Sequence, residues 1–80
     1  MKHLYEVVFE VLWTGKGRRP YWGGDDEVVS LVTNGDARVA IRKAERLVRR
    51  RTLYWRGYGA KWGVGNVKLV SAKRLQVIDQ

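Results

Sequence analysis

The sequence predicts an α+β fold with the order β-β-α-β, in which a three-stranded mixed sheet carries a single amphipathic helix on one face. Three observations predict this split β-α-β arrangement: an alternating apolar pattern near the N-terminus, an apolar stripe at helical spacing in the middle, and a second alternating stretch at the end. The 80 residues are enough for one domain, residues 1–80, and without cysteine no disulfide bond can stabilise it.

The first two strands follow from residue alternation and from the breakers between them. Residues 4–13 have the period of two that is typical of a half-buried strand. Glycines and Pro20 then end the strand, and the loop that runs on to Asp26 is long for a hairpin connection. Residues 27–33 form the second predicted strand. The predicted core face of the first strand consists of Tyr5, Val7, Phe9, Val11 and Trp13.

The helix begins after the second strand. Thr33 fits the N-cap and Asp36 the N3 position of a capping box, and Val32 and Ala37 fit the flanking hydrophobic staple. The helix should end near Arg50, because the next residue, an arginine, would fall on the apolar stripe. That stripe consists of Ala37, Ala40, Ile41, Ala44, Leu47 and Val48.

The C-terminal part of the chain has two predicted segments. Glycines and aromatic rings alternate with basic residues in residues 51–66, which fits either a strongly curved hairpin or a long ordered loop. Residues 67–78 form the last strand, with a bulge or bend at Ser71-Ala72. A right-handed crossover places this strand parallel to the second, with the first strand between them. Its predicted core face consists of Val67, Leu69, Leu75 and Val77.

The positive charge is concentrated in one part of the chain. Residues 38–61 contain nine basic side chains and one acid, which equals the net charge of +8, and the other seven basic and seven acidic residues cancel. Such a local field favours a polyanionic partner, whereas an evenly solvated basic face would serve only solubility. Nucleic acid is therefore the first expected partner, and the sequence does not distinguish DNA from RNA.

Nucleic acids need cations for phosphates and flat rings for unstacked bases. The arginine side of the helix, the glycine and aromatic segment after it, and the loop after the first strand supply both kinds of residue. The candidate nucleic-acid-binding residues are Lys16, Arg18, Arg19, Trp22, Arg38, Arg42, Arg46, Arg49, Arg50, Arg51, Tyr54, Trp55, Arg56, Tyr58, Lys61 and Trp62. The alternative use of the rings is to close a small core.

Two other functions fit the composition. Arg, Trp and Tyr are also common in protein interfaces, so the chain is alternatively a protein–protein module, a homodimer or a small regulator of a larger machine. The compact size and the predicted order resemble short phage or mobile-element proteins in general. A metal-independent ribonuclease is the third alternative, with Arg56, Tyr58 and Lys61 as its candidates.

Catalytic, metal and membrane functions have little support. His3 is the only histidine and lies at the N-terminal end, and the acidic cluster Asp25-Asp26-Glu27 is interpreted as balancing nearby cations. We therefore expect no enzyme, no catalytic residue, no metal and no cofactor. No stretch has the ~18–20 apolar residues of a membrane span, and the N-terminus has no signal-peptide pattern, so a cytoplasmic protein is expected.

Overall fold

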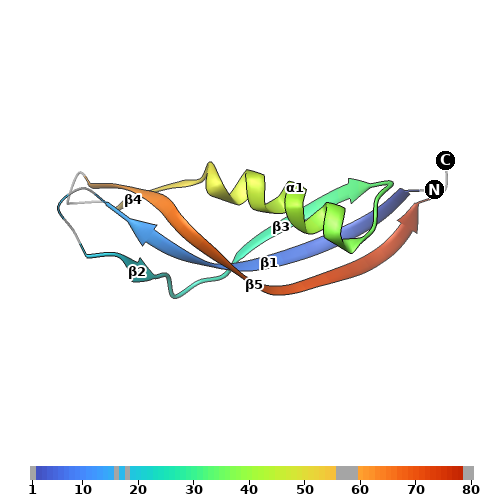
Figure 1. The fold of residues 1–80 in the computed structure, drawn as a ribbon, viewed down its shortest axis with the longest axis horizontal. Coiled ribbons are helices and arrows are strands. Elements are labelled where there is room, and N and C mark those ends of the chain that lie inside the picture. The colour runs from blue at the N-terminus through green and yellow to red at the C-terminus, as the bar shows by residue number, and fades with distance from the viewer. Residues whose placement is uncertain (1, 16, 18, 56–59, 79–80) are drawn as a thin grey trace.

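The computed structural model describes residues 2–15, 17, 19–55 and 60–78. Five strands form one antiparallel sheet, and a single helix covers part of one face (Figure 1). The described molecule is elongated, with extents of 48 × 19 × 17 Å. The elements are β1 (Lys2–Thr14), β2 (Tyr21–Trp22), β3 (Glu27–Thr33), α1 (Ala37–Arg49), β4 (Thr52–Trp55) and β5 (Ala60–Ile78).

The strand β1 is the centre of the sheet. One edge pairs with β3 and then with the short strand β2, and the other edge pairs with β5, which also pairs with β4. The first strand therefore lies between the two long flanking strands, and the α+β class holds. The predicted three-stranded mixed sheet is wrong, because all four pairings are antiparallel and the sheet has five strands. The extra strands β2 and β4 have only two and four residues, which is too short for a periodic pattern.

The strand β5 is longer than predicted and contains irregularities. The 13 residues of β1 face 16 residues of β5, from Gly63 to Ile78, and the register shifts three times. The three unpaired residues of β5 are Gly65, Val70 and Leu75. Because each bulge bends its strand and adds twist, β5 curves around β1 (Figure 1). The predicted bend at Ser71-Ala72 lies directly after one of these residues.

Two side chains of β5 that the sequence predicts in the core are exposed, and a bulge explains one of them. Leu69 and Leu75, both predicted in the core, are 46% and 52% exposed, so this part of the prediction is wrong. Leu75 is itself a bulge residue, and the strict alternation assumed from the sequence does not survive an extra residue. The side chain of Val77 lies outside the described residues. Gly65 contacts β1 closely, since a Cβ there would lie 2.5 Å from Thr14 Cγ2.

The core lies between α1 and the predicted face of β1. Ala40, Ala44 and Val48 are fully buried, and the small alanines allow the helix to approach Phe9 closely. Leu47, at the margin of the apolar stripe, is instead 49% exposed. The buried core cluster comprises Tyr5, Val7, Phe9, Val11, Trp13, Val29, Ala40, Ala44, Val48 and Trp62.

The helix begins at a different cap from the one predicted. Asp36 is the N-cap, and its Oδ1 accepts a hydrogen bond from the Val39 backbone N–H at 3.2 Å. This hydrogen bond lowers the pKa of the Asp36 carboxyl below its usual value. Thr33, the predicted N-cap, accepts from the Gly35 N–H at 3.1 Å in the preceding turn. Both residue types cap helices, so the residue types do not distinguish the two positions, and the structure also brings Val39 close to Gly35. The predicted end is confirmed, with Arg50 as the C-cap.

Candidate nucleic-acid interface

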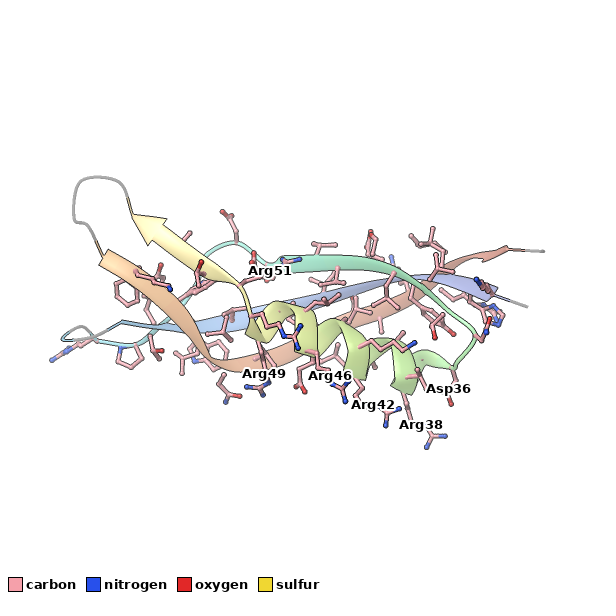
Figure 2. All side chains as sticks on the ribbon, turned by 90° about the horizontal axis from the view of Figure 1, so that it is seen from above. Asp36, Arg38, Arg42, Arg46, Arg49 and Arg51 are labelled. Carbon is pink, nitrogen blue, oxygen red and sulfur yellow. The ribbon has the colours of Figure 1, made fainter. Side chains whose placement is uncertain are left out.

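A row of arginines runs along the side of α1 that faces away from the sheet. Arg38, Arg42 and Arg46 follow one another at four-residue spacing, and Arg49 continues the row, so one helix face carries all four. Figure 2 shows their side chains extending from the same side of the helix. All four residues are exposed. We call Arg38, Arg42, Arg46, Arg49 and the C-cap residue Arg50 the arginine row.

Few carboxylates neutralise the arginine row. Arg38 lies 3.4 Å from Asp36 and Arg49 lies 3.6 Å from Glu45, and both are exposed pairs that water and salt screen strongly. Among the described residues, no carboxylate lies within 4 Å of the guanidinium groups of Arg42, Arg46 or Arg50. The surface of the helix therefore remains positively charged.

Arg51 does not belong to this surface. Its Nη1 lies 3.2 Å from Glu27 Oε1, and its Nη2 donates to the Val28 carbonyl oxygen at 3.2 Å. In Figure 2 its side chain lies over β3, away from the arginines of the helix. The sequence suggested Arg51 as a phosphate contact, but the structure uses it to join the end of α1 to the outer edge of β3.

The rings that the sequence suggested for stacking are divided between the core and the surface. Trp62 is only 7% exposed and packs edge-to-face against Tyr21, with ring centroids 5.2 Å apart. It belongs to the core and presents no open face to a base. Trp22 is 43% exposed, but it pairs with Leu12 and so lies on the sheet face opposite α1. Neither ring stands beside the arginine row.

The other candidates fall into three groups. Arg19 and Lys61 are exposed; Arg19 lies in the loop before β2, and Lys61 is the second residue of β5, where it pairs with Tyr54 of β4. Only the backbones of Tyr54 and Trp55 are described, in β4. Four candidates lie outside the described residues, namely Lys16, Arg18, Arg56 and Tyr58.

An apolar groove with a basic rim lies between α1 and β3. Its volume is about 340 Å³, its apolar part includes Leu31 and Leu47, and its rim carries Lys43, Arg46 and Arg50. The sequence reasoning did not include Lys43 among the candidates. The signal was present, since residues 43, 46 and 50 share one flank of the helix beside the half-exposed leucine.

Comparison of the chain with protein-family models, with curated proteins and with solved structures found no significant match. Within the described ranges, no group of three or more His, Cys, Asp or Glu residues is arranged to hold a metal ion. The helix α1 is too short and too polar to span a membrane.

Proposed function

We propose that this chain is a nucleic-acid-binding module that works by binding and not by catalysis, in the cytoplasm. The observation that supports the proposal is the arginine row, in which three guanidinium groups have no described carboxylate partner. From Arg38 to Arg50 the helix rises about 18 Å, at ~1.5 Å for each of twelve residues. With ~3.4 Å per nucleotide, that length matches about five phosphates along one strand of a duplex.

The main source of affinity in this proposal is the release of counterions from the phosphates. The logarithm of the binding constant falls linearly with the logarithm of the salt concentration. Each phosphate contact makes this slope steeper by ~0.9 for a duplex and by ~0.7 for a single strand. Because Arg42 and Arg46 are exposed and unpaired with described acids, they should contribute almost the full effect.

The experiment compares two double variants with the same change in charge. Arg42→Gln/Arg46→Gln removes two members of the arginine row. Lys68→Gln/Lys73→Gln removes two exposed lysines that pair with Glu10 and Glu6 on the face opposite the helix. Fluorescence anisotropy with labelled duplex and single-stranded DNA and RNA would measure affinity over a salt series.

The arginine variant should lose about 1.4–1.8 from the slope of log affinity against log salt, while the lysine variant should stay close to the wild type. Equal losses in both variants would mean that only net charge matters and would contradict a defined interface. Binding that does not change with salt, or no binding at low salt, would refute the proposal.

Self-association is a second candidate function, favoured by the bare face of the sheet. Val28 and Val32 are 47% and 45% exposed there, beside Val8 and Leu4 of β1. These residues form two apolar pairs separated by Ser30 and Glu6, and a second copy of the chain would cover them, since sheets generally need a second layer. Light scattering after gel filtration should then give a dimer that Val28→Lys converts to a monomer. A monomeric wild type at high concentration would exclude it.

A further inference from the structure

A cavity lies where the connection between β2 and β3 meets the start of β4. Its volume is about 470 Å³, within the range of ~300–1,000 Å³ that is usual for small-molecule sites. The lining includes Trp13 of β1, Tyr21 of β2 and Leu53 of β4, with Gly23 and Asp25 of the connection. We call it the Trp13 pocket. No part of the proposed arginine interface lies in it.

The indole of Trp13 presents an unused donor in this pocket. The side chain is 5% exposed, and its N–H forms no hydrogen bond with a described residue. The Nε1 edge lies at the Gly23 wall, since a Cβ at Gly23 would be 2.6 Å from Nε1. That wall is held in place, because the Gly23 N–H donates to the Val11 carbonyl oxygen at 2.9 Å. Among the described side chains, the fully enclosed polar atom without a partner is His3 Nδ1, so the Trp13 N–H is open to water and can donate to an acceptor on a ligand instead.

Two carboxylates, those of Asp25 and Glu27, also line the pocket. Asp25 is exposed, and no cation lies within 4 Å of its carboxylate among the described residues. Glu27, which also lines the pocket, is already engaged by Arg51 at 3.2 Å. Within the described part of the lining, Asp25 is therefore the carboxylate that no cation engages. The lining also includes Tyr21 and Leu53, an aromatic and an apolar residue that suit a flat ligand.

The pocket and the groove beside the arginine row are lined by neighbouring parts of the chain, although they share no lining residue. The groove contacts β3 at Leu31 and Val32, and the pocket reaches the same strand at its first residue, Glu27. On the helix side, the groove ends at Arg50 and the pocket begins at Arg51. A strand held by the basic rim up to Arg50 would therefore need to extend by only a short distance to bring a base to the residues after Arg51.

We infer that the Trp13 pocket binds cytosine or adenine, the bases with an exocyclic amino group beside an unprotonated ring nitrogen on the Watson–Crick edge. Cytosine and adenine each present an amino donor beside a ring acceptor, which complements the Asp25 carboxylate and the Trp13 N–H. Thymine and uracil lack the amino group and present carbonyl oxygens, which a carboxylate repels. The base comes from a single strand on the arginine row, because a paired base cannot enter a pocket. This inference rests on the proposed function and deepens it.

The test uses single-stranded oligonucleotides of equal length made only of cytidine, adenosine or thymidine. The variant Asp25→Asn changes the pocket carboxylate, and Asp26→Asn is the matched control. Both residues are exposed, and only the first lines the pocket. Anisotropy titrations at one salt concentration would give the affinity of each strand for the wild type and both variants. Trp13→Phe, checked for folding by circular dichroism, removes the indole donor independently.

The wild type should bind the cytidine and adenosine strands about tenfold more tightly than the thymidine strand. Asp25→Asn and Trp13→Phe should each remove most of this preference, and Asp26→Asn should retain it. Equal binding of all strands, or a preference that survives Asp25→Asn, would overturn the pocket while leaving the proposed function intact.

A titration with a free nucleotide tests the Trp13 pocket independently of the arginine row. If no strand binds at low salt, the proposed function fails, and a titration with cytidine monophosphate followed by tryptophan fluorescence then decides on the pocket. Saturable binding that Asp25→Asn weakens would keep the pocket as a nucleotide site. No binding would remove it as well.

Discussion

Replacing Arg51 by alanine should destabilise the protein without weakening its binding to nucleic acid. The side chain joins α1 to β3 through two contacts of 3.2 Å, one with the Glu27 carboxylate and one with the Val28 carbonyl oxygen. The second contact satisfies a backbone acceptor on the outer edge of β3, where the described residues supply no neighbouring strand. Arg51→Ala would leave both acceptors without this donor.

The expected magnitude follows from the exposure of the pair. The side chains of Arg51 and Glu27 are 37% and 24% exposed, so solvent screens the ion pair and its coupling should be about 0.5–1 kcal/mol. The bond to the Val28 carbonyl adds about 0.5–1 kcal/mol. Arg51→Ala should therefore lower the free energy of unfolding by about 1–2 kcal/mol, which is a large part of the stability of a small domain.

The assay is urea denaturation followed by circular dichroism, on a double-mutant cycle. Arg51→Ala, Glu27→Gln and the combination of both give the coupling free energy directly. Arg42→Ala is the control, since this exposed arginine has no described acidic partner and should change stability by less than about 0.5 kcal/mol. The coupling should shrink at high salt.

Arg51→Ala should lose more stability than Arg42→Ala, whereas Arg42→Ala should lose more affinity for nucleic acid. Arg42→Ala should reduce the affinity for nucleic acid and Arg51→Ala should leave it nearly unchanged. The reasoning is refuted by a coupling of zero between Arg51 and Glu27, or by an Arg51→Ala variant that folds as stably as the wild type and loses affinity. The first result would remove the energetic role of the ion pair, and the second would return Arg51 to the interface that the sequence suggested.

Three further predictions concern the fold. Val48→Ala removes a fully buried side chain and should cost about 2–3 kcal/mol in urea denaturation, whereas Leu47→Ala, at a half-exposed position, should cost less than half of that. Gly65→Ala would place a methyl group 2.5 Å from Thr14 Cγ2 of β1 and should lower the free energy of unfolding by about 1–3 kcal/mol. Gly63→Ala, with open space around its Cβ, should leave it nearly unchanged. Asp36 has a lowered pKa in the folded state, so its stabilising effect is present above the ordinary value of 3.8 and is lost as the pH falls below 3.8 toward the folded pKa. Asp36→Asn should therefore flatten the pH dependence of the helical circular dichroism signal in this range. An unchanged profile would contradict the role of Asp36 as the N-cap.

Some elements could be predicted because their signals are local. The alternation in β1 gave the buried face correctly from Tyr5 to Trp13, and the strand at residues 27–33 has the predicted bounds. The helix stripe placed Ala40 and Ala44 in the core and ended the helix at the right residue. Each of these depends on a period of two or of 3.6 residues, which the chain carries without reference to distant partners.

Other elements depend on contacts between distant residues. The short strands β2 and β4 exist because Trp22 meets Leu12 and Leu53 meets Trp62, and two to four residues carry too little pattern to show this. The bulges of β5 arise from its pairing with β1, and they moved Leu75 from the expected core to the surface. The predicted N-cap, Thr33, proved to be three residues too early, because Asp36 accepts the Val39 N–H while Thr33 accepts the Gly35 N–H.

The sequence by itself determined the α+β class, the central strand, the amphipathic helix and the position of the positive charge, because charge and periodicity are properties of neighbouring residues. Only the tertiary structure decided that Arg51 is tied to β3, that Trp62 lies in the core beside Tyr21, and that an indole and a carboxylate face one cavity. The physical reason is that a basic or aromatic side chain serves equally well on a surface or in a contact, and the choice depends on which distant partner the fold brings within reach.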